Sequence, residues 1–246
     1  MSEKQPLGVL ILHGFTGSLD TVRAIVPRVE RLGWPYRMPL LRGHGTRYED
    51  LVGVTREDWI TDANAALDEL LGECERVVVV GLSMGGLVAL NLAMRRESAI
   101  AGLVLIAPAL RFADPLTHLT PLLKLLFTFW DSPSSFADKQ LEATTCTNYK
   151  KFPTATFSQL LDLANETERK LPTCRVPAVG LFTRRDTVVH RIVASLLAEK
   201  LAGPFKAIWF ERTGHEMLQD VEADAVADAV GEAIASHAAA PLAKGA

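Results

Sequence analysis

The residue most able to act as a nucleophile in this chain is a serine in the pentapeptide GLSMG, at residues 81–85. The pentapeptide follows the strand-like run RVVVV and precedes the helix-like run GLVALNLAMRR. Between a strand and a helix, G-x-S-x-G can form a tight, strained turn that presents the serine hydroxyl above a sheet. The N-terminus of the following helix would also favour negative charge at this point. Ser83 is therefore the predicted nucleophile.

A serine hydroxyl is a weak nucleophile at neutral pH, so it needs a base that a third group keeps in the correct tautomer. The six candidate bases are His13, His44, His118, His190, His215 and His237. Where such a turn lies above an α/β sheet, the triad order along the chain is Ser, then Asp or Glu, then His. His215 meets this order in the tripeptide TGH, just after the strand-like segment FKAIWFE. We expect His215 to be the base, and His118 and His237 to be ordinary packed or solvated residues.

Two aspartates compete to orient that base. Asp186, in TRRDTVV, directly follows the strand-like run VPAVGLFT, whereas Asp114 follows the run AGLVLIA after a longer gap. The shorter gap favours Asp186, and Asp114 is the alternative.

A tetrahedral oxyanion needs two hydrogen-bond donors, one from the residue after the nucleophile and one from the loop after the first strand. These would be the backbone N–H groups of Met84 and Phe15, the latter in HGFTG at residues 13–17. Since backbone amides do this work, the Phe15 side chain is free to line a pocket. His13 is then expected to be structural.

The elements that would position these residues alternate along the chain. Four continuous apolar runs, at 7–14, 76–83, 101–108 and 176–183, are typical of strands buried on both faces of a parallel sheet, and 34–40 and 205–210 are weaker candidates. Helix-like segments occur at about 19–32, 57–72, 84–96, 188–202 and 218–237. This alternation predicts a mostly parallel, doubly wound sheet with ligands at the carboxyl ends of its strands.

Residues 109–174 interrupt the alternation, because a crossover needs only a dozen residues or somewhat more. We expect this segment to contain a small cap, within one domain spanning residues 1–246. Its part 115–130 is apolar nearly all round, and helical periodicity resumes at 155–171. So apolar an element must be covered, either as a helix packed on the main domain, as a wall of an acyl pocket, or by a membrane surface or a second copy.

Composition limits the class of protein. Hydrophobic residues make up 48% and charged residues 22% of 246, which argues against a disordered chain and a membrane protein. The net charge is −3 and the basic residues are scattered, so nucleic acid is not an expected partner. The short N-terminal apolar run and three widely spaced cysteines favour a cytoplasmic protein without disulfides. No ligand cluster indicates a metal or organic cofactor.

Several motifs together resemble the small bacterial carboxylesterases and monoacylglycerol lipases of the α/β hydrolases. They are HGFTGS at 13–18, LLRGHGTRYEDL at 40–51, TREDWI at 55–60, GLSMGG at 81–86, YKKFPTATFSQLLDLA at 149–164, TRRD and TGH. GLSMGG is widespread among such enzymes, whereas RGHGT with the following Tyr-Glu-Asp is much narrower. The resemblance covers nearly the whole chain, and implies Ser83, Asp186 and His215 as the triad with Phe15 and Met84 as oxyanion donors.

The expected activity is hydrolysis of short- to medium-chain acyl esters or monoacylglycerols through an acyl-enzyme, by a monomer or small homo-oligomer without stable membrane insertion. Acyl transfer, other chemistry on the same triad, and a ligand sensor with a slow triad are the alternatives. We interpret the RGHG segment, with Arg42 and His44, as a scaffold loop. The sequence departs from the bacterial monoacylglycerol lipases at one point, because Lys150 follows the cap residue Tyr149 where an acidic residue is expected. This departure weakens the case for glycerol recognition.

Overall fold

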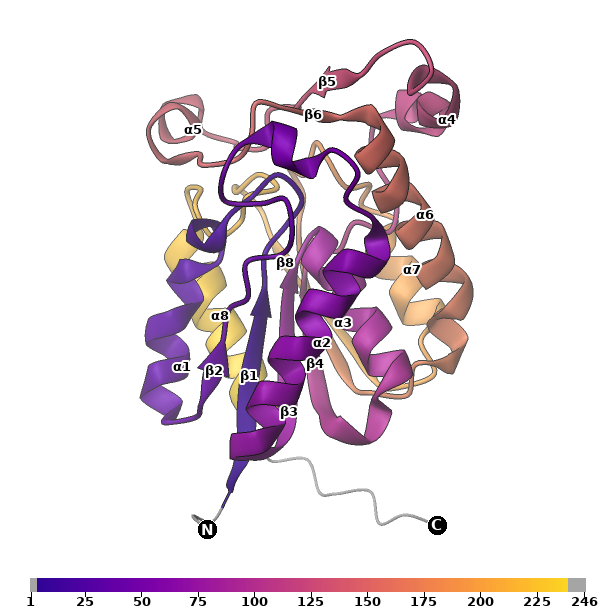
Figure 1. Cartoon of the computed structure of the whole chain (residues 1–246). Coiled ribbons are helices and arrows are strands. Elements are labelled where there is room, and N and C mark those ends of the chain that lie inside the picture. Colours follow the sequence, from indigo (N-terminus) through magenta and orange to yellow (C-terminus); the bar gives the residue numbers. More distant parts are fainter. Residues whose placement is uncertain (1–3, 239–246) are drawn as a thin grey trace.

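The computed structural model describes residues 4–238, and its centre is a six-stranded sheet whose neighbouring strands are all parallel (Figure 1). The strand order is β2-β1-β3-β4-β7-β8. The strands of this sheet are β1 (Gln5–Leu12), β2 (Tyr36–Arg37), β3 (Cys74–Leu82), β4 (Ile100–Ile106), β7 (Ala178–Thr183) and β8 (Phe205–Phe210). The reversal of strand order beside β1 and the parallel pairing define a doubly wound sheet, as predicted.

The apolar runs form strands because both faces of the sheet are buried. In β1, Leu10 and Leu12 face one core while Val9 and Ile11 face the other, and all four are fully buried. Successive side chains of a strand point to opposite faces, so a strand covered on both sides must be apolar at every position. The continuous runs, as opposed to alternating ones, are therefore the correct signal for these strands.

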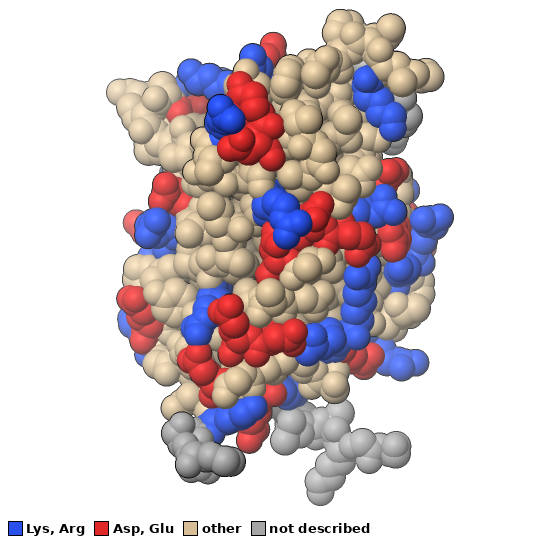
Figure 2. All heavy atoms as spheres, viewed as in Figure 1, with Lys and Arg blue, Asp and Glu red and all other residues tan. Residues whose placement is uncertain are grey.

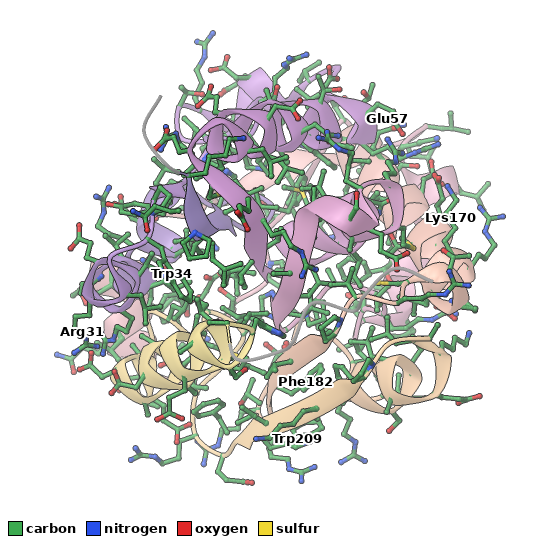
Figure 3. The ribbon with its side chains drawn as sticks, turned by 90° about the horizontal axis from the view of Figure 1, so that it is seen from below. Arg31, Trp34, Glu57, Lys170, Phe182 and Trp209 are labelled. Carbon is green, nitrogen blue, oxygen red and sulfur yellow. The ribbon has the colours of Figure 1, made fainter. Side chains whose placement is uncertain are left out.

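Helices cover both faces of the sheet, as the view from below shows (Figure 3). Helices α2, α3, α6 and α7 contribute to one core, and α1 and α8 to the other. The helices are α1 (Val26–Leu32), α2 (Arg56–Glu73), α3 (Met84–Arg95), α4 (Thr120–Leu123), α5 (Lys139–Thr145), α6 (Thr154–Lys170), α7 (Val193–Lys200) and α8 (Ala223–Ser236). At the last two strands, the rings of Phe182 and Trp209 lie 5.2 Å apart.

The predicted fold class is confirmed, and each of the four strong apolar runs contains a strand. The helices predicted at 19–32, 188–202 and 218–237 are shorter than expected, since they correspond to α1, α7 and α8. The segment 19–32 is helical only from Val26, after two 3₁₀ turns at Leu19–Thr21 and Arg23–Ile25. Pro27 lies in the first turn of α1, a position where its missing N–H costs nothing, so the helix begins there.

Residues 109–174, here called the inserted segment, lie mostly above the carboxyl ends of the strands (Figure 1). They include α4, α5, α6 and a two-stranded antiparallel sheet of β5 (Phe129–Asp131) and β6 (Lys151–Pro153). Helix α6 packs against α3 and α4, and its buried Leu160 and Leu163 join the core on that face of the sheet. The helical periodicity predicted for 155–171 is thus realised as α6.

The interpretation of 115–130 as a helix packed on the main domain is wrong. The segment forms a 3₁₀ turn at Pro115–Leu119 and the short α4, and it ends in β5. Pro121 in the first turn of α4 cannot continue a preceding helix, which explains the break. Its described apolar side chains are largely exposed, and they are Leu116, Leu119, Leu122, Leu125, Leu126 and Phe127.

The molecular surface around α4 carries few acidic side chains (Figure 2). In Figure 2 the top right of the molecule, where Figure 1 places α4, is largely free of acidic groups, while lower down acidic and basic side chains are intermixed. Within residues 4–238, no helix combines the length and the apolar character that crossing a membrane requires.

Candidate active site

Ser83 lies in a strained turn between β3 and α3. Its backbone has φ 53° and ψ −112°, an unfavourable conformation for a residue with a side chain, and its N–H donates to the Ile106 carbonyl at 2.8 Å. The turn requires glycine on both sides. A Cβ at Gly81 would overlap the backbone of Gly85, and a Cβ at Gly85 would overlap the carbonyl of Leu12. The G-x-S-x-G spacing thus permits close backbone approach here.

The structure brings together the three residues that the sequence predicts as a triad. His215 Nε2 lies 3.0 Å from Ser83 Oγ, and His215 Nδ1 lies 2.9 Å from Asp186 Oδ2. The other carboxylate oxygen, Asp186 Oδ1, accepts hydrogen bonds from the N–H groups of Val188 and Val189, each at 2.8 Å. The three side chains follow β3, β7 and β8, whose parallel carboxyl ends meet at one edge. This geometry permits proton transfer from the serine to an oriented imidazole.

Burial and a carboxylate act in opposite directions on His215. Burial of the ring disfavours its charged form, but the charge of Asp186 and its hydrogen bond outweigh that effect, so the pKa of His215 is raised. The raised pKa makes the ring a stronger base in its neutral form. Such a group can take a proton and hold it through a reaction step.

The loop after β1 lies directly against Ser83. A Cβ added at Gly14 would lie 3.3 Å from Ser83 Cβ, and Thr16 has a positive φ of 63°. Within the described residues, the Phe15 amide donates to no protein acceptor, and Met84 is the first residue of α3, where helix amides have no intrahelical partner. Both predicted oxyanion donors are therefore available near Ser83.

His13 and His44 are buried and have local structural partners. His13 Nδ1 lies 2.8 Å from the Gly14 carbonyl, and His13 Nε2 accepts from the Leu41 N–H at 3.1 Å. Burial lowers the pKa of His13 to about 4 and that of His44 to about 3, so both rings are neutral near pH 7. Neither ring contacts Ser83 Oγ, and both hold the loops beside it.

The remaining described rivals make no hydrogen bond to the triad, although Asp114 lines the same cavity as Ser83. His237 packs over Gly102, with Nε2 3.3 Å from the Leu103 carbonyl, and His190 Nδ1 accepts from the Ile192 N–H. The side chain of His118 is outside the described part of the structure. The rival acid Asp114 caps a 3₁₀ turn by accepting from the Leu116 N–H at 2.8 Å, and it makes no hydrogen bond to His215.

The RGHG loop is tied to the inserted segment by Tyr149. Its hydroxyl donates to the Gly43 carbonyl at 3.1 Å and accepts from the Thr46 N–H at 2.9 Å. The Tyr149 N–H in turn donates to the Thr16 carbonyl at 2.9 Å. Tyr149 thus connects the loop after β1 with the loop after β2, which fits the scaffold role predicted for the RGHG segment.

Ser83 and His215 open into a cavity of about 880 Å³ between the sheet edge and the inserted segment. This volume suits a ligand of small-molecule size. One part of the lining, the aromatic wall, is apolar and includes Phe15, Phe112, Phe152, Phe157, Leu160 and, from the segment 115–130, Trp130. The polar wall includes Ser132, Ser134, Ser135, Asn148, Lys150, Thr187 and Glu216. The cavity therefore offers separate places for an apolar chain and a polar group.

Sequence reasoning missed Glu216 and Asn148 in the polar wall. Glu216 directly follows His215, is 6% exposed, and accepts from Asn148 Nδ2 at 2.6 Å through Oε1. Burial raises the pKa of Glu216, which favours the protonated carboxyl. The sequence held no clear signal for these two residues, because neither belongs to a motif and their contact depends on the fold.

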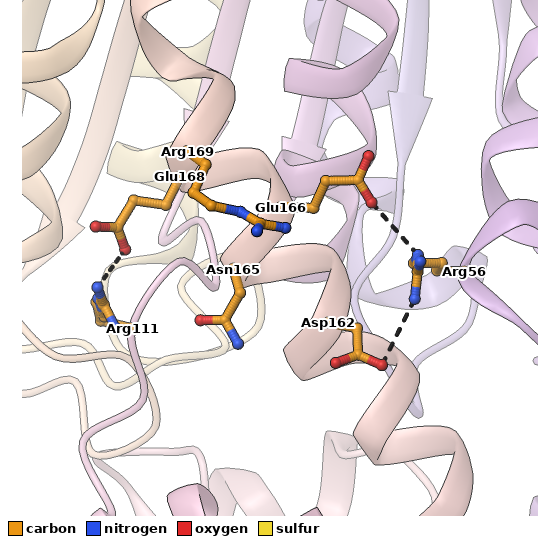
Figure 4. A pocket seen from close by; sticks show the side chains of 7 residues that line it. All are labelled: Arg56, Arg111, Asp162, Asn165, Glu166, Glu168 and Arg169. Atoms are coloured by element: carbon orange, nitrogen blue, oxygen red, sulfur yellow. Dashed lines mark ion pairs between the residues drawn. The ribbon is translucent and has the colours of Figure 1, made fainter.

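A second hollow, of about 640 Å³, lies on the outer side of α6 and, apart from Asn165, is lined by charged residues (Figure 4). Arg56 pairs with Asp162 and Glu166 at 3.5 Å, and Arg111 pairs with Glu168 at 2.7 Å. These ion pairs join α6 to α2 and to the chain after β4. These pairs connect the inserted segment to its neighbours, although Arg56 Nε donates no hydrogen bond and Glu168 Oε2 accepts none within the described residues. Within residues 4–238, no group of three or more His, Cys, Asp or Glu side chains is arranged so that it could hold a metal ion.

Comparison with known proteins defines the class. The model of the Alpha/beta hydrolase family matches residues 9–229, so the chain belongs to that family. The thermostable monoacylglycerol lipase of Bacillus sp. (strain H-257) is 31% identical over 210 residues, which are 84% of this chain and 81% of that protein. The carboxylesterase of Bacillus subtilis (strain 168) is 26% identical over 224 residues, 89% and 88% of the two chains. This protein is therefore an esterase- and lipase-like hydrolase, as the motifs predict.

Solved structures give the same fold. A structure from work on LipS and LipT, two metagenome-derived lipolytic enzymes, has a TM-score of 0.87 and 26% identity, covering 96% of each chain. The monoacylglycerol lipase of Paleococcus ferrophilus has a TM-score of 0.79 at 16% identity, covering 95% of this chain and 96% of its own. The predicted α/β-hydrolase fold is thereby confirmed.

Proposed function

We propose that this protein is a serine carboxylic ester hydrolase that acts on short- to medium-chain acyl esters or monoacylglycerols through an acyl-enzyme intermediate. The observation that carries the proposal is the hydrogen-bonded series Asp186, His215 and Ser83, with its two contacts of 2.9 and 3.0 Å, at the base of a cavity. The related monoacylglycerol lipase and carboxylesterase support ester hydrolysis as the reaction class. In this proposal residues 1–246 form one domain, and residues 109–174 contain its cap.

The mechanism begins when Ser83 Oγ attacks the ester carbonyl carbon and His215 Nε2 takes the serine proton. The backbone N–H groups of Phe15 and Met84 donate to the resulting oxyanion. Asp186 stabilises the protonated ring, which then gives its proton to the leaving alcohol oxygen as the carbon–oxygen bond breaks. Water, activated by the neutral His215, attacks the acyl-enzyme and releases the acid and free Ser83.

The cavity supports an acyl chain of limited length. Phe15, Phe152 and Phe157 form an aromatic group with ring centroids 5.0–6.0 Å apart, and Phe112 lies 5.3 Å from Phe157. An acyl chain against these rings buries apolar surface, which favours binding by about 0.8 kcal/mol for each buried methylene. We place the acyl group on this aromatic wall and the alcohol on the polar wall.

The proposal includes a cytoplasmic location. The three cysteines Cys74, Cys146 and Cys174 are free thiols, and free thiols are usual in that compartment.

The test compares the wild type with Ser83→Ala on p-nitrophenyl esters of graded chain length and on 1-monoacylglycerols, measuring acid release. We expect the wild type to hydrolyse esters and the variant to be inactive, with an optimum at short or medium chains. Comparable hydrolysis by the variant, or no hydrolysis of any ester by the wild type, would contradict the proposal. Product analysis with added alcohols separates hydrolysis from acyl transfer.

A further inference from the structure

Two oxygen atoms in the polar wall of the cavity have no hydrogen-bond partner in the described structure. They are Glu216 Oε2 and Asn148 Oδ1, and both are shielded from solvent by the surrounding protein. A buried polar atom without a partner costs free energy, so a native structure that keeps two of them side by side needs an explanation. Because the two residues line the same cavity as Ser83, a ligand group is the natural partner.

The two residues are held together and fixed from both sides. Asn148 Nδ2 donates to Glu216 Oε1 at 2.6 Å, which leaves Oε2 and Oδ1 as the free atoms. The Glu216 N–H donates to the Ser135 carbonyl at 3.2 Å, and Tyr149, next to Asn148, is anchored to Thr16. This placement fixes the pair between the loop of His215 and the loop of the predicted oxyanion donor Phe15.

The chemistry of the pair matches a hydroxyl group. Burial, and to a smaller extent the charge of Asp186, raise the pKa of Glu216 against the opposing effects of His215 and Asn148, which favours the protonated carboxyl. A protonated carboxyl can donate through Oε2, while an amide oxygen such as Asn148 Oδ1 can accept. One donor beside one acceptor complements a hydroxyl, which itself donates and accepts. A cationic alcohol fits less well, because Lys150 lines the same cavity.

We propose that Glu216 and Asn148 form a subsite for a hydroxyl group on the leaving alcohol, so that the preferred substrates are esters of polyhydric alcohols such as glycerol. The position follows from the reaction, since the alcohol oxygen must receive its proton from His215 Nε2, and Glu216 is the next residue. This inference rests on the proposed ester hydrolysis. In the bacterial monoacylglycerol lipases that the sequence resembles, an acidic residue is expected after the cap tyrosine, where this chain has Lys150. The inference assigns alcohol recognition in this chain to a different acidic residue, Glu216, which follows His215.

The test uses two esters of the same medium-chain acid, the 1-monoacylglycerol and the ethyl ester, with wild type, Glu216→Leu, Glu216→Gln and Asn148→Leu. We expect Glu216→Leu and Asn148→Leu to lower the ratio of kcat/KM for the glycerol ester to that for the ethyl ester by about tenfold, mainly through KM. Glu216→Gln, which keeps a donor and an acceptor, should retain the ratio within about threefold. Glu142→Gln is the matched control, because Glu142 also lines the cavity but its carboxylate is paired with Ser134 and Lys139.

An unchanged ratio in folded Glu216→Leu would overturn the subsite. So would a larger loss of activity on choline esters than on glycerol esters, which would indicate a cation site. Should Glu216→Leu fail to fold by thermal denaturation, half-buried Asn148→Leu gives the same test.

Binding of a non-cleavable 1-O-alkylglycerol, compared with the matching alkyl ethyl ether by calorimetry, is independent of turnover. We expect the wild type to bind the glycerol ether about tenfold more tightly, and Asn148→Leu to lose that preference. Loss of ester hydrolysis with this preference intact would contradict the proposed function alone. Equal affinities would contradict the subsite alone.

Discussion

Helix α6 borders both of the hollows described above, and the two differ in the chemistry of the side chains that line them. Its Phe157 and Leu160 line the cavity above Ser83, whereas Asp162, Glu166 and Glu168 line the charged hollow (Figure 4). In the charged hollow, carboxylates of α6 pair with arginines of neighbouring elements. In the Ser83 cavity, a reactive hydrogen-bonded series meets an apolar wall and two oxygens without partners. The ion pairs join α6 to its neighbours, whereas the two oxygens beside the triad are the atoms to which we assign a ligand hydroxyl.

Removal of the proposed nucleophile should have the largest effect on activity. Ser83→Ala should lower kcat/KM for a p-nitrophenyl ester by about 10⁴-fold or more while leaving the melting temperature nearly unchanged, because only a small hydroxyl is removed. Steady-state kinetics and thermal denaturation measure the two effects. Ser98→Ala, at an exposed position away from the cavity, is the matched control and should keep activity within about threefold. A Ser83→Ala variant with a tenth of wild-type activity would exclude Ser83 as the nucleophile.

Asp186→Asn should have the next largest effect. The amide cannot stabilise the protonated His215 ring and favours the wrong tautomer, so we expect a loss of about 10³- to 10⁴-fold in kcat/KM. Asp114→Asn tests the alternative acid, and its kcat/KM should change by less than about threefold. Both variants are measured on the same ester. Equal losses of kcat/KM would show that the hydrogen bond between His215 and Asp186 does not identify the aspartate that acts in catalysis.

The pH profile tests the electrostatics of the same contact. Ester hydrolysis needs neutral His215, and Asp186 raises the pKa of that ring. Activity should therefore be present above this pKa and fall as the pH drops through it, with a midpoint above the ordinary histidine value of about 6.5. In Asp186→Asn, the residual activity should persist to lower pH, because the main opposition to the effect of burial on the pKa of His215 is then removed. Profiles of kcat/KM from about pH 5 to about pH 9 measure both. A wild-type midpoint well below about 6.5 would contradict the raised pKa.

A substitution in the charged hollow should have the opposite pattern of effects. It should lower the free energy of unfolding and leave the rate of ester hydrolysis nearly unchanged. Glu168 accepts from Lys200 at 2.8 Å, pairs with Arg111 at 2.7 Å, and its side chain is 9% exposed. Glu168→Gln removes both attractions, so we expect a loss of about 1–3 kcal/mol in the free energy of unfolding, or about 3–8 °C in Tm. Activity should stay within about twofold.

Glu57→Gln is the matched control for this change. Glu57 pairs with Arg95 at 3.3 Å, but both side chains are exposed, and such pairs contribute little. Its Tm should shift by less than about 2 °C. A tenfold fall in the activity of folded Glu168→Gln would show that the two sides of α6 are functionally coupled.

The core sheet was predictable from the sequence because its physical requirement is simple. Strands covered on both faces must be apolar at successive positions, so runs such as 76–83 have few alternatives. The positions of Ser83, Asp186 and His215 after strands then follow from the parallel topology. The inserted segment has no such requirement, and six described apolar side chains between Leu116 and Phe127 are exposed although the same composition is typical of a buried helix.

The polar wall was also beyond sequence reasoning. Glu216 and Asn148 are separated by 67 intervening residues, and neither belongs to a recognisable motif. Their contact exists only because α5 and the chain after it return to the loop of His215. A single sequence does not specify that return path, since it depends on contacts between irregular segments.

Covalent labelling of the nucleophile tests the mechanism most directly. The protein is treated with diethyl p-nitrophenyl phosphate, and intact-mass spectrometry and peptide mapping locate the adduct. We predict one diethylphosphoryl group per chain on the peptide containing Ser83, release of one equivalent of p-nitrophenol, parallel loss of esterase activity, and no adduct in Ser83→Ala. An adduct at another residue, or complete inactivation of the wild type with Ser83 unmodified, would contradict Ser83 as the nucleophile.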